Sequence, residues 1–187
     1  HSSLYNNTTG YLNSAIGDNS MYFNTTGYDN TALGYRSLYS NSVGYGNSGI
    51  GLQALYTNSS GNYNVACGML TLYSNIVGSQ NTAIGYGAGF GNTDQALNTF
   101  VGYYAGYEAN GYYNTFVGSN SGTTGGDGNT AIGRNALSND AATDCTAVGY
   151  AAGDDYSPGS GCTFLGMDAD ALAPDLTNSS AIGHGAN

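Results

Sequence analysis

The chain has 187 residues, of which 7% are charged, against about 25% in typical soluble domains. It contains 31 Gly and 18 Tyr, its two basic residues are Arg36 and Arg134, and its formal net charge is −10. Phosphate groups and anionic lipids are bound by Lys and Arg, so we expect no binding to nucleic acid and no docking on an anionic membrane. No apolar run approaches the roughly 20 residues of a membrane span, and we expect no membrane insertion.

A five-residue phrase, Asn-Thr-Ala-Ile-Gly, recurs in exact or varied form along the whole chain, for example at residues 81–85 and 129–133. Successive closing glycines are 17 residues apart, except for three shorter gaps of 16, 15 and 16 near the middle. A disordered tract has no reason to keep such a period, so it indicates a repeat architecture. The closing glycines are Gly17, Gly34, Gly51, Gly68, Gly85, Gly102, Gly118, Gly133, Gly149, Gly166 and Gly183.

A unit of 17 residues is too short for a helix pair or a propeller blade, and its glycines and turn residues interrupt helices. The unit suits one coil of a β-solenoid. We therefore predict an all-β fold, a parallel β-solenoid (β-roll) of about eleven 17-residue coils. Residues 1–187 form one predicted domain, with an aromatic-rich part (1–110) and an acidic part (111–187) that meet near the shorter gaps.

We number each repeat from its closing glycine, which takes position 0. Position −1 is apolar in every repeat and most often β-branched, as strands favour. Side chains alternate between the faces of a strand, so position −1 shares a face with the Thr or Ser usual at position −3. We interpret both positions as facing inward. The predicted core ladder at position −1 is Ile16, Leu33, Ile50, Cys67, Ile84, Val101, Val117, Ile132, Val148, Leu165 and Ile182.

An aromatic column occupies position +5 in the first part of the chain. Coils stack about 4.8 Å apart, so these side chains are expected to form a ladder. Facing outward, the ladder would be a continuous aromatic stripe of the kind found at interfaces, whereas packed inward it would belong to the core. The candidate interface ladder is Tyr5, Tyr22, Tyr39, Tyr56, Tyr73, Phe90 and Tyr107.

The repeat pattern is in phase at both ends, since Leu4 and Tyr5 already hold ladder positions and Ile182-Gly183 closes the last repeat. Solenoids normally carry polar capping repeats, because a bare end coil leaves a row of unpaired backbone groups. We expect these ends to be covered by flanking domains or by another copy of the chain. Head-to-tail pairing that does not close produces a filament.

Residues 81–88 and 129–136, Asn-Thr-Ala-Ile-Gly followed by x-x-Ala, resemble the head repeats of YadA-like trimeric autotransporter adhesins. Residues 35–41 resemble the continuation of the Asn-Thr-Ala-Ile-Gly-Tyr-x-Ala-Leu repeats of bacterial and phage-type fibre proteins. The resemblance covers essentially the whole chain, although the autotransporter units are shorter than 17 residues. It implies a left-handed parallel β-roll that is trimeric, lies on the cell surface and binds host or matrix molecules.

Groups suited to catalysis are sparse. The two histidines, His1 and His184, lie near opposite ends, and a chain without Lys cannot form a P-loop. We therefore expect neither an enzyme nor a cofactor. The segment Gly125-Gly126-Asp127-Gly128 is similar to a Ca²⁺-binding nonapeptide, and Asp154-Asp155 adds carboxylates, but the nonapeptide does not recur. Solvated acidic loops are the expectation, and no metal site is predicted.

Cys145 and Cys162 both replace the Asn of position −4, in consecutive repeats. At a coil spacing of about 4.8 Å their Cα atoms fall within the range of about 4.4–6.8 Å that disulfides span. Parallel Cβ directions would have to tilt for the bond to form. The pair is therefore a disulfide candidate, with two free thiols as the equal alternative.

Several Asn residues lie in Asn-x-Ser/Thr sequons, three of them at one turn position. Glycans attached there would line one edge of the rod. The alternative, which we favour, is that Asn followed by Ser or Thr is good turn chemistry. The glycosylation candidates are Asn7, Asn24, Asn58 and Asn178.

We expect an extracellular or cell-surface structural and adhesive fibre that assembles with copies of itself, as a filament or a trimer. The alternative is a surface-binding adhesin head that recognises glycans or host molecules. Ice binding is a less favoured alternative, because its regular Thr column would have to face outward and would bring the apolar column out with it. That column is Thr82, Thr99, Thr115, Thr130, Thr146 and Thr163.

Overall fold

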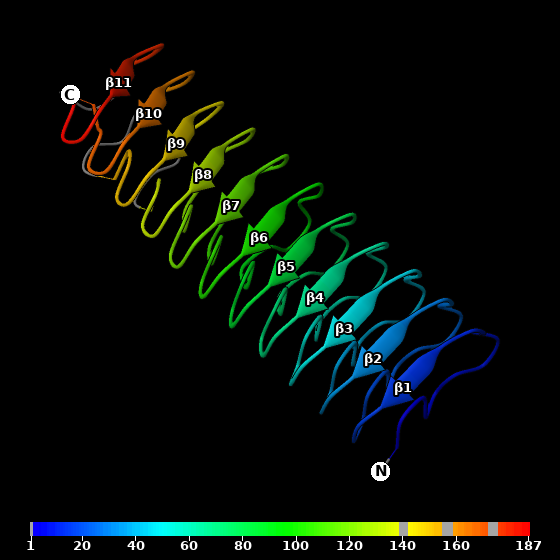
Figure 1. The fold of residues 1–187 in the computed structure, drawn as a ribbon. Helices are drawn as coiled ribbons and strands as arrows, with labels where there is room; N and C mark the ends of the chain where they lie inside the picture. Colours follow the sequence, from blue (N-terminus) through cyan, green and yellow to red (C-terminus); the bar gives the residue numbers. More distant parts are fainter. Residues whose placement is uncertain (1, 139–141, 155–158, 172–175) are drawn as a thin grey trace.

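The computed structural model describes residues 2–138, 142–154, 159–171 and 176–187. The predicted parallel β-solenoid is confirmed: eleven three-residue strands form one parallel sheet in sequence order, and the coils wind into a rod (Figure 1). The strands are β1 Ser14–Ile16, β2 Thr31–Leu33, β3 Ser48–Ile50, β4 Val65–Cys67, β5 Thr82–Ile84, β6 Thr99–Val101, β7 Thr115–Val117, β8 Thr130–Ile132, β9 Thr146–Val148, β10 Thr163–Leu165 and β11 Ser180–Ile182.

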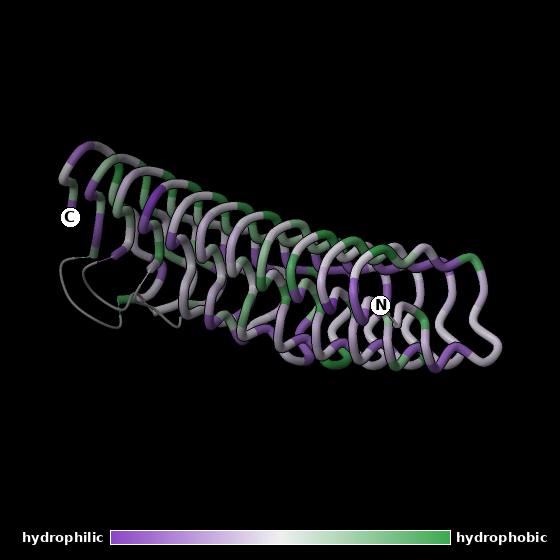
Figure 2. The backbone as a smooth tube through the Cα atoms, turned by 90° about the horizontal axis from the view of Figure 1, so that it is seen from below, coloured by the Kyte–Doolittle hydropathy of each residue, from purple (hydrophilic) through white to green (hydrophobic). Residues whose placement is uncertain are grey.

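Each strand pairs with its neighbour at equal repeat positions, as in Thr82↔Thr99 between β5 and β6. The register holds across the shorter repeats too, where Thr115 pairs with Thr130. The shortening is therefore taken up in the turns between strands. Equal strand positions of consecutive coils lie above one another along the rod, whose stacked coils are visible in Figure 2, so each of these positions forms a column.

The interior is built from position −2 of the repeat. Ala83 and Phe100 at that position are fully buried, whereas Ile84 at position −1 is 43% exposed. The predicted core ladder is therefore wrong, because the strands present the opposite face inward. Its members Ile16, Leu33, Ile50, Cys67, Ile84, Ile132, Leu165 and Ile182 are exposed, and Val101, Val117 and Val148 are half-buried.

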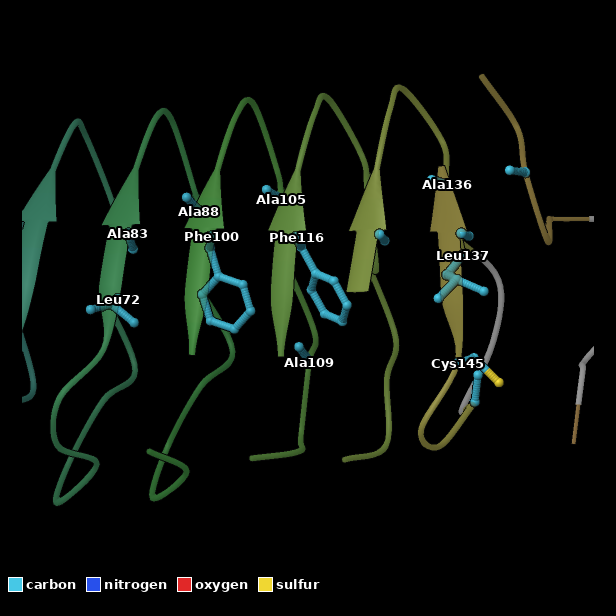
Figure 3. Close-up of a cluster of buried hydrophobic side chains, with 14 of the residues drawn as sticks. Leu72, Ala83, Ala88, Phe100, Ala105, Ala109, Phe116, Ala136, Leu137 and Cys145 are labelled. Atoms are coloured by element: carbon cyan, nitrogen blue, oxygen red, sulfur yellow. The ribbon is translucent and has the colours of Figure 1, made fainter. Parts of the chain in front are cut away.

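The small width of the coil explains this inversion. Position −2 faces positions +3 and +4 of the opposite wall, and the two walls leave room for one large side chain. Through Leu72 the large side chain comes from position +4 and the strand supplies Ala, as Ala83 does. Further along, Phe100 fills the space from the strand and position +4 becomes Gly106, whose added Cβ would lie 2.4 Å from the Phe100 ring (Figure 3).

Two columns of buried Asn side chains bond the coils together along the axis. At position −4, Asn47 Nδ2 donates to Gly61 O at 2.8 Å, and Asn47 Oδ1 accepts from Asn64 N at 3.0 Å. At position +7, Asn58 Nδ2 donates to Asn41 Oδ1 at 2.8 Å. Buried amides cost free energy unless they are hydrogen-bonded, and here each coil supplies partners for the next.

The closing glycine lets consecutive coils approach closely at the bend after each strand. Gly34 has φ +137°, and a Cβ added there would lie 2.4 Å from Gly51 O. Backbone in this region is accessible to Gly and strained for other residues. The column of closing glycines is thus required by the backbone-to-backbone contact at this corner.

Candidate interaction surface

The outward face of the sheet carries two exposed columns. Position −1 supplies the apolar residues that were predicted as core, and position −3 supplies Thr82 and its equivalents, which are half-buried or exposed. Side chains alternate between the two faces of a strand, so positions −1 and −3 lie on one face, as predicted. That face is the outer one and not the inner one. Position +1 adds Tyr35, Leu52 and Met69 beside the sheet, each about 40% exposed.

We call these three columns, at positions −3, −1 and +1 of the eleven repeats, the outer face. Its charged residues are Asp18 and Arg134, and His184 is its titratable residue in the last repeat. The other acidic residues of the chain lie at other repeat positions. A chain of net charge −10 thus has a long apolar face with little charge of its own. Large exposed apolar patches mark interaction sites in soluble proteins.

The aromatic ladder lies at the surface, half-buried except for Tyr5, which is 67% exposed. Its rings stack face to face along the rod: Tyr39 and Tyr56 have centroids 5.0 Å apart and an interplanar angle of 1°. The stack continues through Phe90 to Tyr107. Because neighbours cover both faces of each inner ring, the ladder presents ring edges to solvent.

Two further aromatic groups lie elsewhere on the coils, one starting in the first coil and one near the middle of the rod. Tyr11 and Tyr28 stack at 4.9 Å, and Tyr103 and Tyr104 have centroids 4.2 Å apart. Desolvation by neighbouring groups and repulsion from Tyr45 raise the pKa of Tyr28, and a hydrogen bond with the Tyr86 side chain raises the pKa of Tyr104. The phenols of Tyr28 and Tyr104 therefore stay neutral over the physiological pH range.

The predicted disulfide is not formed. Cys145 and Cys162 are buried free thiols that continue the Asn column of position −4. Cys145 Sγ contacts Gly159 O at 3.4 Å, and Cys162 N donates to Cys145 Sγ at 3.3 Å. The two side chains lie parallel in the column and bond to the backbone in the way the Asn amides do. The candidate disulfide between Cys145 and Cys162 is therefore wrong, and both residues are free thiols.

Two glycosylation candidates are also wrong for the folded chain. Asn24 and Asn58 are fully buried in the Asn column of position +7. Asn58 Nδ2 donates to both Asn41 Oδ1 and Gly61 O, so the amide that would carry a glycan is sequestered. Asn7 and Asn178 are exposed and stay candidates.

Among the described residues, no group of three or more His, Cys, Asp or Glu side chains is placed to hold a metal ion. Asp127, in the segment with a Ca²⁺-loop-like sequence, accepts a hydrogen bond from Tyr112 N at 2.8 Å. Ser138 Oγ donates to Asp154. His1 and Asp155 lie outside the described residues. Asp127 and Asp154 thus bond to the neighbouring coil.

No family model, curated protein or solved structure matches this chain. In the described part of the chain, no helix has the length and apolar character required to cross a membrane. The sequence signal that identifies the outer face is a pairing of positions that the initial interpretation did not use: Phe at position −2 accompanies Gly at position +4 of the same or the preceding repeat. Only an inward-facing position −2 requires that pairing.

Proposed function

We propose that this chain is a structural and adhesive segment of an extracellular fibre that assembles with copies of itself through its sheet edges and its side-chain ladders. The observation that carries the proposal is the single sheet of eleven parallel strands in one register. Within the described chain, β1 and β11 each have one neighbouring strand, so each leaves an edge to which a further coil can bond.

The two edges match in sequence and direction. β1 is Ser-Ala-Ile and β11 is Ser-Ala-Ile. Along the rod, N–H groups at position −3 donate to the next coil, as Thr163 N does to Ser179 O at 2.8 Å. By the same geometry, Ser180 N points toward the open edge, where it can donate to Asn13 O of a second copy.

One steric condition applies to this stacking. With Gly183 next to Gly17 of a second copy, residues 184–187 would occupy the repeat positions that residues 1–4 of that copy hold. Leu4 N already donates to Ser20 O, which is the acceptor for that position. One of the two four-residue segments must therefore turn aside for the edges to meet.

Electron microscopy and light scattering of the purified chain test the proposal. Filaments are expected, and Ser180→Pro should abolish them, because proline removes the donor that faces the open edge. Ser180→Ala keeps that N–H and is the matched control, so it should still form filaments. Dispersed particles at every concentration, or filaments that Ser180→Pro leaves intact, would contradict end-to-end stacking.

The adhesin-head alternative requires a different recognition mode from aromatic stacking. Sugars commonly bind on ring faces, and the inner rings of the Tyr ladder have both faces covered by neighbours. Tyr5, at the first rung, is stacked by Tyr22 on one side. Glycan binding to the ladder, if observed on an array, should therefore be lost in Tyr5→Ala and retained in Tyr56→Ala.

Ice binding is a second candidate, favoured by one observation. The Thr column at position −3 faces outward on the sheet, as ice binding requires, with the apolar column beside it. A regular array of hydroxyl and methyl groups can order water along the rod. Thermal hysteresis that disappears in Thr115→Lys would support this function, and a chain that produces no hysteresis removes it.

A further inference from the structure

We infer that the outer face binds the outer face of a second copy, with the two rods antiparallel. The inference rests on the proposed function, since it names the partner of the ladder surface. It is argued from the exposure, charge and size of that face.

Exposure is continuous along the rod. Ile50, Ile84, Ile132 and Leu165, spread over β3 to β10, are each 41–47% exposed, although they belong to a single column. Solvated apolar side chains in a column gain free energy when a second surface covers them. A flat column is covered best by another flat column of the same spacing.

The distribution of charge over the chain favours a second copy as the partner of the outer face. Two chains of net charge −10 repel one another over most of their surfaces. The outer face carries Asp18 and Arg134, whose charges cancel, so two copies can meet there with little repulsion. This face is where self-association costs least.

Size fits a dimer. Ten coil intervals of about 4.8 Å and the four rises of about 3.3 Å between positions −3 and +1 give a face of about 600 Å² per copy. Pairing two faces buries about 1,200 Å², which is at the lower end of stable protein–protein interfaces. The dimer is therefore expected to dissociate at high dilution.

The antiparallel arrangement follows from the carboxylate of Asp18 and the imidazole of His184, which lie at opposite ends of the face and can hydrogen-bond when paired. A two-fold axis along the strand direction places like columns together and sets the first rung against the eleventh. Asp18 and His184, both at position +1, then face one another twice in each dimer. The middle strand β6 crosses the axis, so Val101 meets Val101 and Ile84 meets Val117.

The test uses the Ser180→Pro chain, in which end-to-end stacking is blocked; the substitution lies at one end of the outer face and leaves the other ten rungs of that face unchanged. Sedimentation equilibrium should show a monomer–dimer equilibrium. Ile84→Asp should weaken it by at least about 100-fold, because it buries an unpaired charge twice in each dimer. Val77→Asp is the matched control, since Val77 is 48% exposed on another face, and it should leave the dimer unchanged.

Charge exchange tests the orientation. His184→Asp places carboxylates opposite one another and should weaken the dimer by about 3–10-fold, as expected for pairs at an exposed rim. The double variant Asp18→His with His184→Asp should restore it. A monomer at all concentrations, a trimer, or a dimer that Ile84→Asp leaves intact overturns the inference, and failure of the exchange to restore pairing overturns the antiparallel arrangement. Absence of filaments from the unsubstituted chain, with retention of the dimer, would instead contradict end-to-end stacking alone.

Discussion

The coils up to Leu72 and the coils around Phe100 and Phe116 fill the same interior in opposite ways. In the first set, Leu38, Leu55 and Leu72 at position +4 reach in from the curved wall, and the strand supplies Ala or Gly. In the second set, Phe reaches in from the strand and Gly lines the wall. The comparison shows that the volume of the interior is fixed while the residue that fills it is free to move.

Removing the large residue should have the largest effect. Phe100→Ala leaves a cavity that no neighbour fills, because Gly89 and Gly106 surround the ring. We expect a loss of about 3–5 kcal/mol in the free energy of unfolding, measured by urea denaturation. Tyr103→Ala, 52% exposed in the same coil, is the control and should cost far less. Equal losses from both variants would contradict the assignment of Phe100 to the interior.

The stability cost of adding volume to the opposite wall should depend on the Phe100 ring. Gly106→Ala places a methyl group against Phe100 and should cost about 1–3 kcal/mol by overpacking. Gly106 has φ +62°, and the backbone strain is the same in either background, so it cancels in a double-mutant cycle. In the Phe100→Ala background the overpacking cost should vanish. Strictly additive losses would show that the two walls do not share one space.

The polar columns also differ between the two regions. The first region has Asn at both −4 and +7, whereas the last three repeats of the acidic part have Cys145, Cys162 and Ser179 at position −4. Asn58→Ala leaves the buried Asn41 Oδ1 without its donor and removes the acceptor of Asn75 Nδ2, and should cost about 2–4 kcal/mol. Cys145→Ala should cost about 1 kcal/mol in the same assay, because thiols bond weakly. A larger loss from Cys145→Ala than from Asn58→Ala would contradict the view that the buried Asn columns stabilise the rod.

Thiol reactivity gives the smallest and cleanest contrast. Cys67 is exposed on the outer face, whereas Cys145 and Cys162 are buried, and burial raises the pKa of the Cys145 thiol. A thiol reagent should titrate one group in the native chain and three after unfolding. Three rapidly reacting thiols in the native chain would contradict the interior column, and a single thiol after unfolding would indicate a disulfide.

The architecture could be predicted from the sequence because the closing glycines recur at a nearly constant spacing. Gly85 and its equivalents mark each bend, and the phrase before them marks each strand, so coil length and strand position follow directly. The Asn at position −4 belongs to the same recurring phrase, and Asn47 bonds to the coils on both sides of it.

The inside and outside of the strand could not be predicted from hydrophobicity alone. Ile84 is more apolar than Ala83, so the usual rule places Ile inside, and a three-residue strand offers no longer pattern to decide between them. The narrow interior favours the small residue instead. The pairing of Phe with Gly was the available signal, since it makes sense only if the two positions share a space.

The outward direction of position −1 is the central claim, and one pair of variants tests it most directly. Ala83→Asp and Ile84→Asp differ by one residue on the same strand and should be compared by thermal unfolding at a concentration where the chain is monomeric. Ala83→Asp should unfold the rod by burying a charge, at a cost of at least about 3 kcal/mol, and Ile84→Asp should cost no more than about 1 kcal/mol. The opposite order would contradict the outer face and every inference built on it.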